Sequence, residues 1–342
     1  MADTRLPLVI NDTSKIQLER ISHVYFEHHD FEKFANFAAD FGLSEAWHDD
    51  DTVLYRGYGK DQYCYVARRS QNGEVAFRGS AWVAQTQVDF DKATKLAGAV
   101  VNDLSKWPGG GKIVTLKTPC GFEIHVIYGQ QDREVLATVP TVQIDHMGLL
   151  NGSIKKQRFG EFQRFHPGPA LVHKLGHLGY IVGRFEEEFT WYTNNFNFVP
   201  SDVQYQPDKE DMDVITFMHI DLGDTYSDHH SLFIARGAPG EHDRMHHTSY
   251  EVENFDTQLL GHEWLASKKY ESVWGVGRHI LGSQIFDYWR DTSGFMIEHY
   301  ADGDLVNQHT GTDRSAAGPL AVWGPELPKE FREDGTKKPV GP

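Results

Sequence analysis

Hydrophobic residues recur along the chain in two alternating patterns. Short runs rich in β-branched and aromatic residues are typical of strands, and aromatic residues spaced by three or four positions are typical of one helix face. The segment 21–43 contains both, because it opens with ISHVYF and continues with phenylalanine at positions 31, 34, 37 and 41. Gly42 follows as a plausible helix stop. We therefore predict a strand, then a helix over about 31–41, then a turn.

The same pattern returns about one domain length later. The segment 175–199 reads LGHLGYIVGRFEEEFTWYTNNFNFV, with Phe185, Phe189 and Tyr192 at helical spacing. A short run opening with a histidine, His23 in the first copy and His177 in the second, begins each pattern. Such self-similarity indicates an internal repeat.

Two further pairs of segments follow in the same order. The segment 81–100 resembles 247–266, and each reads as a strand and an amphipathic helix with an acidic N-cap, at Asp91 and Asp256 respectively. A turn and strand then close each half, at 118–129 and at 292–303. These paired landmarks predict an α+β fold in which four βαβββ units form two similar domains.

The repeat also predicts the domain boundaries. We place an N-terminal domain at 1–130, an interdomain connection at 131–172 and a C-terminal domain at 173–310. The last segment, 311–342, is rich in glycine, proline and charge, and we expect an arm over the surface that is partly ordered at best.

Composition narrows the possible partners and the compartment. The net charge of −16 argues against nucleic-acid binding, which needs a basic face. Two cysteines exclude a disulfide framework and favour a reducing compartment. No apolar run is long enough for a transmembrane helix, and the first residues lack the features of a signal peptide. We expect a soluble, cytoplasmic protein without a membrane or nucleic-acid partner.

Among 19 histidines, only spacing can single out functional ones. His177, His247 and Glu298 stand at equivalent points of the second repeat, each within a predicted strand. Two imidazoles and one carboxylate on one face can hold a metal that activates O2 while leaving open positions for substrate. His246 competes with His247 for this role. In the run around Glu298, residues 295 and 297 alternate with 296 and 298, which puts Glu298 on one face.

These segments carry a resemblance. LGHLGYIV, MHHTSYEV and DTSGFMIEHYADG resemble the ligand motifs of the type I extradiol ring-cleavage dioxygenases in the vicinal oxygen chelate superfamily, in order and approximate spacing. The resemblance implies domains that form incomplete β-barrels around a cleft. It also implies Fe(II), with Mn(II) as an alternative, on His177, His247 and Glu298. O2 would be a co-substrate, a small aromatic diol the substrate, and a homo-oligomer the assembly.

Two further segments extend the resemblance. GRHILGSQIFDYWRDTSG resembles the family stretch that carries a histidine and a tyrosine beside the substrate, here His279 and Tyr288. SDHHSLFIA resembles the stretch that carries the acid–base histidine, which maps onto His230, with the neighbouring His229 as a competitor. One departure is visible, because Gly282 stands where some members have an aspartate. A hydrogen-bonding partner is then missing or supplied elsewhere.

Several other side chains receive ordinary interpretations. The first repeat has His23, Trp82 and His125 at the positions of the ligands, so we predict no metal there and a role as scaffold and subunit interface. Solvent exposure is expected for His28, His29, His242, His246 and the run Glu186–Glu188. Aromatic residues such as Tyr250, Trp289 or Phe295 are expected to line the pocket.

Two other functions fit parts of the same pattern. One is a metal-dependent isomerase, epimerase or lyase of the glyoxalase type, which would not need His230 and Tyr288. The other is a protein that binds a small molecule without catalysis, which has no need of an open metal face. Oxygen consumption separates the first of these from ring cleavage.

Overall fold

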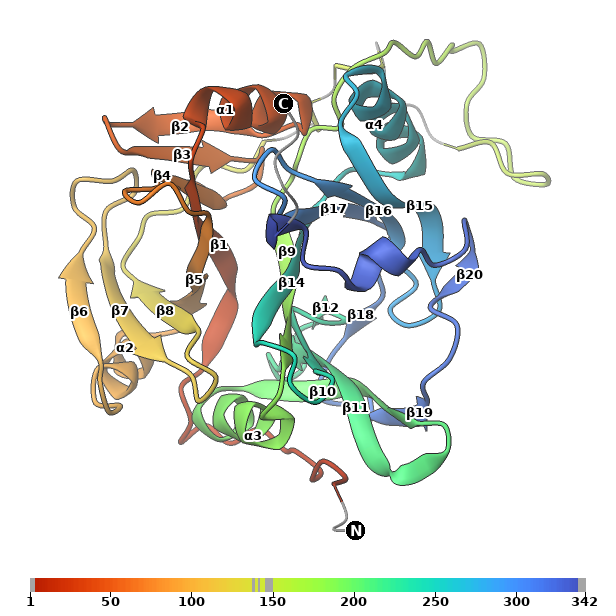
Figure 1. The fold of residues 1–342 in the computed structure, drawn as a ribbon. Coiled ribbons are helices and arrows are strands. Elements are labelled where there is room, and N and C mark those ends of the chain that lie inside the picture. The colour runs from red at the N-terminus through yellow and green to blue at the C-terminus, as the bar shows by residue number, and fades with distance from the viewer. Residues whose placement is uncertain (1–3, 137–138, 141, 145–149, 338–342) are drawn as a thin grey trace.

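The structure is a computed structural model that describes residues 4–136, 139–140, 142–144 and 150–337. It contains an 8-stranded sheet, a 10-stranded sheet and a 2-stranded one, with few helices (Figure 1). The two large sheets lie side by side, the first built from the N-terminal part of the chain and the second from the C-terminal part. This arrangement confirms the predicted α+β fold class.

Two βαβββ units form the 8-stranded sheet, whose strand order is β2-β3-β4-β1-β5-β8-β7-β6. In each unit the last strand pairs in parallel with the first, and β1 pairs antiparallel with β5 to join the units. The elements are β1 (Leu18–His28), α1 (Phe31–Asp40), β2 (Ser44–His48), β3 (Thr52–Arg56), β4 (Tyr65–Arg69), β5 (Ala76–Ala84), α2 (Gln87–Ala93), β6 (Val100–Asp103), β7 (Lys112–Lys117) and β8 (Glu123–Tyr128).

The 10-stranded sheet repeats this plan in the order β19-β10-β11-β13-β9-β14-β17-β16-β15-β20. Here β9 pairs antiparallel with β14, and β13 and β17 close the two units in parallel. The elements are β9 (Leu175–Val182), α3 (Phe185–Asn195), β10 (Phe198–Gln206), β11 (Lys209–Ile220), β12 (Ser227–Asp228), β13 (Leu232–Arg236), β14 (Arg244–Glu251), α4 (Phe255–Ser267), β15 (Glu271–His279), β16 (Ile285–Arg290), β17 (Met296–Ala301) and β18 (Leu305–Val306).

Three of the four described α-helices start at a polar side-chain cap, and two of these caps differ from the predicted residues. In α1 the Asp30 side chain accepts from the backbone N–H of Lys33 at 3.0 Å. In α2 and α4, however, the caps are Thr86 and Asn254, because their side chains accept from the backbone three residues on. Asp91 lies inside α2 and Asp256 in the first turn of α4, so both predicted caps were wrong. No described helix is long and apolar enough to cross a membrane.

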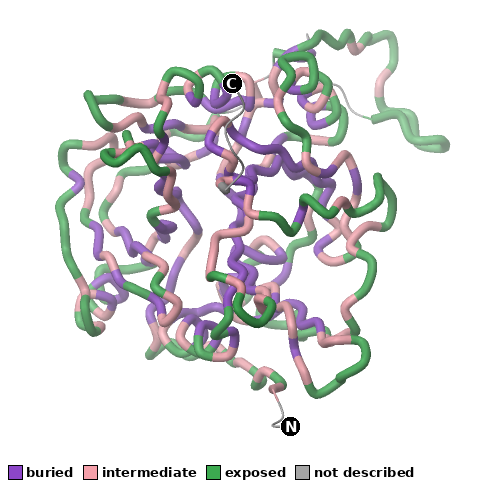
Figure 2. The backbone as a smooth tube through the Cα atoms, in the orientation of Figure 1, coloured by how far each residue is buried: buried purple, intermediate pink, exposed green. Residues whose placement is uncertain are grey.

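The main hydrophobic core lies between the two large sheets and draws on both. Strand residues alternate between faces, so Leu178 and Tyr180 of β9 join Trp82 and Val126 of the first sheet in this core. The tube view shows the buried backbone concentrated along these central strands, while residues 150–166 extend outward as an exposed loop (Figure 2). The two halves are therefore parts of one packed body.

The three aromatic residues expected in the pocket belong to this core instead. Tyr250 and Trp289 are fully buried, and Phe295 is 8% exposed, all within the cluster between the sheets. Phe295 packs on Phe26 of β1, with ring centroids 4.6 Å apart. The prediction was wrong because Tyr250 and Trp289 lie on strand faces opposite to the candidate site residues, while Phe295 precedes β17 and packs in the core.

Buried polar groups also join the halves. His28 is fully buried, with Nδ1 2.7 Å from the Ser293 hydroxyl and Nε2 2.8 Å from the Tyr65 hydroxyl. Glu188 is fully buried, and its Oε2 accepts from the backbone N–H of Cys120 at 2.9 Å. The exposure predicted for these two side chains was wrong, since both satisfy groups at the interface between the sheets.

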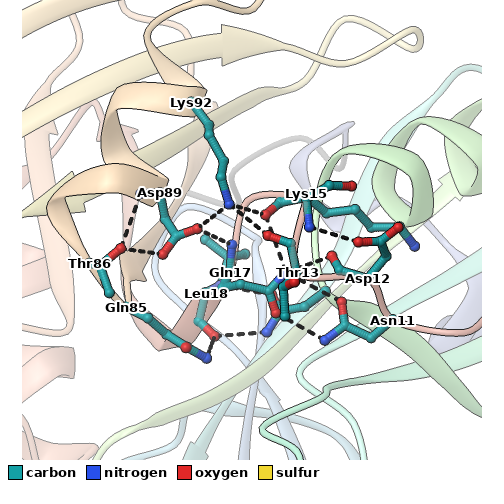
Figure 3. A network of polar contacts seen from close by, with 12 residues as sticks. Asn11, Asp12, Thr13, Lys15, Gln17, Leu18, Gln85, Thr86, Asp89 and Lys92 are labelled. Carbon is teal, nitrogen blue, oxygen red and sulfur yellow. Dashed lines mark hydrogen bonds and ion pairs between the residues drawn. The ribbon is translucent and has the colours of Figure 1, made fainter.

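Charged side chains of α2 hold the segment that precedes β1 (Figure 3). Lys92 donates to the backbone oxygens of Thr13 and Lys15 at 2.9 and 2.7 Å and to Asp89 at 2.8 Å. Asp89 in turn accepts from the backbone N–H of Gln17 at 3.1 Å. This network fixes the entry of the chain into its first strand.

The C-terminal arm is more structured than its composition predicts. It adds β19 (Asp313–Ala316) to one edge of the 10-stranded sheet and β20 (Ala321–Trp323) to the other, and continues into the short helices η1 (Lys329–Arg332) and η2 (Gly335–Lys337). Phe331 of η1 is 8% exposed and packs beside Tyr288, with ring centroids 4.9 Å apart. The boundaries of the domains, of the connection and of the arm remain predictions.

Acid should destabilise the fold partly through His28. Burial lowers the pKa of His28 from its ordinary value of 6.5 to about 3, so the folded protein keeps it neutral where the unfolded chain protonates it. Its contribution to stability is therefore lost as pH falls from about 6.5 towards about 3, at roughly 1.4 kcal/mol per pH unit. We expect His28→Asn to show a shallower pH dependence of the unfolding free energy, measured by urea denaturation.

The exposed neighbour offers a matched control for this test. His29→Asn should keep the wild-type slope, since its side chain is exposed. An unchanged slope in His28→Asn would contradict the assignment, whatever the absolute stability of the variant.

Candidate active site

Three adjacent strands bring the predicted metal ligands together. His177 lies on β9, His247 on β14 and Glu298 on β17. Ser249 of β14 pairs with both His177 and Glu298 across the sheet, and His247 stands two residues earlier on the same strand. Residues two apart on a strand share a face, so the three side chains point to the same side.

The three side chains form one buried group that can hold a metal ion. One ligand atom from each lies within 4.8 Å of the others. Glu298 Oε2 is 3.1 Å from His177 Nε2 and 3.3 Å from His247 Nε2. The exposed fractions are 2% for His177, 4% for His247 and 0% for Glu298.

Hydrogen bonds around His247 fix which of its nitrogens carries the proton. His246 donates from Nε2 to the backbone oxygen of Phe331 at 2.9 Å, because a carbonyl can only accept. Burial lowers the pKa of His246 well below its usual value, so its Nδ1 is an acceptor, and His247 donates to it from Nδ1 at 2.8 Å. Burial also lowers the pKa of His247. Neutral His247 therefore turns a bare Nε2 towards Glu298.

A cation resolves what would otherwise be a costly arrangement. Neither oxygen of Glu298, nor Nε2 of His247, has a hydrogen-bond partner among the described residues. Burial alone would raise the pKa of Glu298, but the neighbouring His177 outweighs it and holds that pKa far below its usual range. An ionised carboxylate thus faces the lone pair of His247 in a buried site, and a metal ion would satisfy both.

His230, the predicted acid–base residue, lies against the triad and has its own support. Its ring centroid is 4.2 Å from that of His177. His229 donates from Nε2 to Asp202 at 2.6 Å, and its Nδ1 is 3.1 Å from Nδ1 of His230. That contact engages Nδ1 of His230 and leaves its Nε2 outside the bond. Burial, with the neighbouring histidines, lowers the pKa of His230 well below its usual value.

Gly282 makes room for His229. It has a φ of +73°, and a Cβ at this position would lie 2.8 Å from Nδ1 of His229. A side chain here would therefore displace the residue that orients His230. Some members of the family that the sequence resembles have an aspartate at this position. In this chain the glycine leaves room for the imidazole of His229 instead.

His279 and Tyr288 meet each other on the other side of the triad. Nε2 of His279 is 2.9 Å from the Tyr288 hydroxyl, and its Nδ1 donates to the backbone oxygen of Leu320 at 3.1 Å. The missing partner of His279 is thus supplied by the C-terminal arm. Burial lowers the pKa of His279 to about 4, and burial with the nearby Glu298 raises the pKa of Tyr288 well above 10. Tyr288 therefore donates to a neutral His279.

The corresponding place in the N-terminal half is built differently from the prediction. His23 pairs with Ala81, and Ala81 with His125, as His177, Ser249 and Glu298 pair in the second half. The residue two before Ala81 is Gly79, so Gly79 and not Trp82 matches His247. Trp82 is fully buried in the core. The sequence alignment was wrong because bulges shift the pairing of β1 with β5.

The imidazoles of His23 and His125 already have hydrogen-bond partners. His23 bonds to Ser22 and Tyr25, and His125 bonds to Thr115 and to the backbone oxygen of Arg78. A Cβ at Gly79 would lie 2.8 Å from Nε2 of His125. The absence of a metal from the N-terminal half remains a prediction.

A cavity of about 580 Å³ opens over the triad. His177, His247, His230, His279 and Tyr288 all line it, so five of the six predicted site residues share one space, and Glu298 lies directly behind them. The structure adds Asp202, Leu320 and Phe331, which sequence reasoning missed, and it gives a supporting role to His229 and to His246, whose predicted exposure was wrong. The doubled histidines 229–230 and 246–247 were the available signal, because in each pair the first residue orients the second.

Comparison with known proteins places this half of the chain. Residues 174–299 match the Glyoxalase/Bleomycin resistance protein/Dioxygenase superfamily. The matched range includes all three triad residues. Metapyrocatechase 2 of Cupriavidus necator is 34% identical over 122 residues, which span 35% of this chain and 36% of that protein.

Two solved structures extend the likeness in fold to both halves. Homoprotocatechuate 2,3-dioxygenase from Brevibacterium fuscum, in complex with 3,4-dihydroxyphenylacetate, has a TM-score of 0.74 at 14% identity, over 93% of this chain and 92% of that one. The Mn(II)-bound glyoxalase from Novosphingobium aromaticivorans has a TM-score of 0.71 at 19% identity, over 92% and 94%. At these identities the likeness is one of fold.

Removing the carboxylate should empty the candidate metal site. We expect Glu298→Gln to lose bound metal, because a neutral amide replaces the one anion that faces the two imidazoles. Metal per chain is measured by inductively coupled plasma mass spectrometry after anaerobic reconstitution with Fe(II).

Asp287→Asn is the matched control. Asp287 is also a fully buried carboxylate on an adjacent strand, but it bonds to His262 and Trp289 and not to the triad. This variant should keep its metal. Full metal content in Glu298→Gln would refute the ligand assignment.

Proposed function

We propose that the protein is an extradiol dioxygenase that opens the ring of a catechol-type substrate beside the diol and incorporates both atoms of O2. The observation that carries the proposal is the buried triad of two histidines and one glutamate, with His230, His279 and Tyr288 lining the same cavity. A muconic semialdehyde-type product follows from cleavage at this position.

The comparisons support this activity over others of the superfamily. Metapyrocatechase 2 is 34% identical to this chain over the aligned stretch, whereas the Mn(II)-bound glyoxalase is 19% identical. The dioxygenase of similar fold is in complex with an aromatic diol. The alignment with metapyrocatechase 2 covers about a third of that protein.

His177, His247 and Glu298 would hold Fe(II), and Mn(II) accepts the same nitrogen and oxygen ligands. When bound, such a metal supplies a positive charge that favours the ionised diol and a redox-active centre for O2 chemistry. The protein residues contribute orientation and proton handling.

His230 would act as the base for a substrate hydroxyl. Its Nε2 would be the acceptor, while Nδ1 is engaged by His229, whose Nε2 bonds to Asp202. The same nitrogen can later return the proton. An imidazole suits both steps because one ring nitrogen can accept a proton and later return it.

Tyr288 and His279 would recognise the diol oxygens. The Tyr288 hydroxyl now donates to His279, and both side chains line the cavity next to His247. Burial fixes their positions before substrate arrives, so only the Tyr288 O–H has to turn from His279 to meet developing negative charge. The homo-oligomer and the cytoplasmic location remain predictions.

A glyoxalase-type isomerase or lyase is the second candidate, favoured by the fold likeness to the Mn(II)-bound glyoxalase. The two activities differ in oxygen use. Anaerobically purified protein with bound metal is offered a panel of catechols, and oxygen uptake and a yellow product are followed. Oxygen uptake with a ring-opened product supports the dioxygenase. Bound metal without uptake on any catechol supports the isomerase or lyase.

His230→Ala should keep its metal and lose turnover. We expect kcat for ring cleavage to fall by about 10²–10⁴, the usual contribution of a general acid–base residue. His219→Gln is the control, because His219 is also buried but bonds to Ser201 and does not line the cavity. A wild-type rate in His230→Ala would rule out this role.

Tyr288→Phe should lower kcat by about 10²–10³, as removal of one preorganised donor does in other enzymes. The variant leaves the ring in place and removes only the hydroxyl that bonds to His279. Steady-state oxygen uptake and metal content are measured together. Loss of metal in this variant would mean that Tyr288 acts on the structure of the site and not on the substrate.

A further inference from the structure

The cavity over the triad is larger than a catechol ring requires. Its volume of about 580 Å³ falls within the range of about 300–1,000 Å³ that is usual for pockets holding drug-sized ligands. A ring bound beside His230 and Tyr288 would fill one end only. The rest of the space must accommodate a substituent or stay filled with water.

The wall away from the triad is mostly apolar. It comes from strands β9 and β11 on one side and from the arm on the other. Among these lining residues are Ile181, Met212, Val214, Ile215, Pro319 and Leu327. The polar side chains in this lining include the neutral amides Gln204, Gln206 and Gln284. Such a surface favours an uncharged, hydrophobic group.

Of the arginine side chains that line the cavity, Arg236 and Arg244 are already paired within the protein, and Arg332 is the exception. Arg236 forms two hydrogen bonds to Glu186, at 2.6 and 3.2 Å, and further bonds to the backbone of Asp213. Arg244 is paired with Glu241 and donates to the backbone oxygen of Arg332 at 2.7 Å. A substrate carboxylate buried here would lack a free counter-charge, which is costly. The exception, Arg332, has an exposed side chain at the rim.

We propose that the substrate is a catechol with a bulky, uncharged apolar substituent, such as an aryl or branched alkyl group. This inference rests on the proposed ring cleavage and names its substrate class. It sets this chain apart from the fold relative that holds 3,4-dihydroxyphenylacetate, whose substituent is anionic. Arg332 can meet only a group that extends through the mouth into solvent.

The test compares substituents on the holoenzyme. Phenylcatechols substituted at either ring position, unsubstituted catechol and 3,4-dihydroxyphenylacetate are assayed for kcat/KM by oxygen uptake. Binding is measured separately by anaerobic calorimetry, so that affinity is read without turnover. We expect the better phenylcatechol to exceed both other substrates by at least about 10-fold in kcat/KM, as burial of extra apolar groups usually gives, and to bind more tightly.

Adjacent alanines in the arm provide a matched pair of variants. Ala317 lines the cavity, whereas Ala316 is exposed and does not. Ala317→Phe should lower kcat/KM for phenylcatechol relative to catechol by about 10-fold or more, because it fills space meant for the substituent. Ala316→Phe should keep the wild-type ratio.

Each alternative result has a distinct meaning. Preference for 3,4-dihydroxyphenylacetate, lost in Arg332→Met, would overturn the substrate class and leave ring cleavage standing. An equal effect of both alanine variants would overturn the assignment of the substituent space. Absence of oxygen uptake with every catechol would overturn the proposed function and the substrate class together.

Discussion

A buried carboxylate without hydrogen-bond donors is the constraint on which the C-terminal half depends. Glu298 is fully buried, and a charge in such a place is tolerated only when something cationic compensates it. The surrounding residues are arranged so that no protein group does this fully. His247 is held as a neutral acceptor by His246, and the oxygens of Glu298 find no donor among the described residues. A bound metal ion would supply the positive charge that the protein groups do not.

The internal repeat explains how such a site can exist in a stable protein. Both halves use the same strand pairing, but the first has glycine and histidine where the second has His247 and Glu298. Its imidazoles are satisfied internally, and its sheet supplies half of the shared core. One copy thus contributes hydrophobic packing, and the other carries the costly polar cluster. The core between the sheets offsets the cost of ordering that cluster.

The sequence was informative wherever periodicity or a repeated motif expressed a physical requirement. The strand and helix order, the four units and the grouping of His177, His247 and Glu298 all followed from it. Bulges defeated the alignment of Trp82 with His247, because an inserted residue leaves no mark in a hydrophobic pattern. Tyr250 and Trp289 were misplaced because aromatic composition was given more weight than strand parity. The carbonyls of Leu320 and Phe331 could not be found at all, since every residue has a carbonyl group.

The carbonyls of Leu320 and Phe331 make the site depend on the C-terminal arm, which is synthesised after the triad. His279 is held by Leu320 and His246 by Phe331, although the histidines precede their acceptors by 41 and 85 positions in the chain. A nascent chain that has been synthesised only to residue 310 would contain all three triad residues but neither acceptor. Without these acceptors, the imidazoles of His279 and His246 would be free to rotate and exchange protons with water. Competence for the proposed chemistry would therefore arrive late in biosynthesis, after the scaffold has folded and the arm has docked.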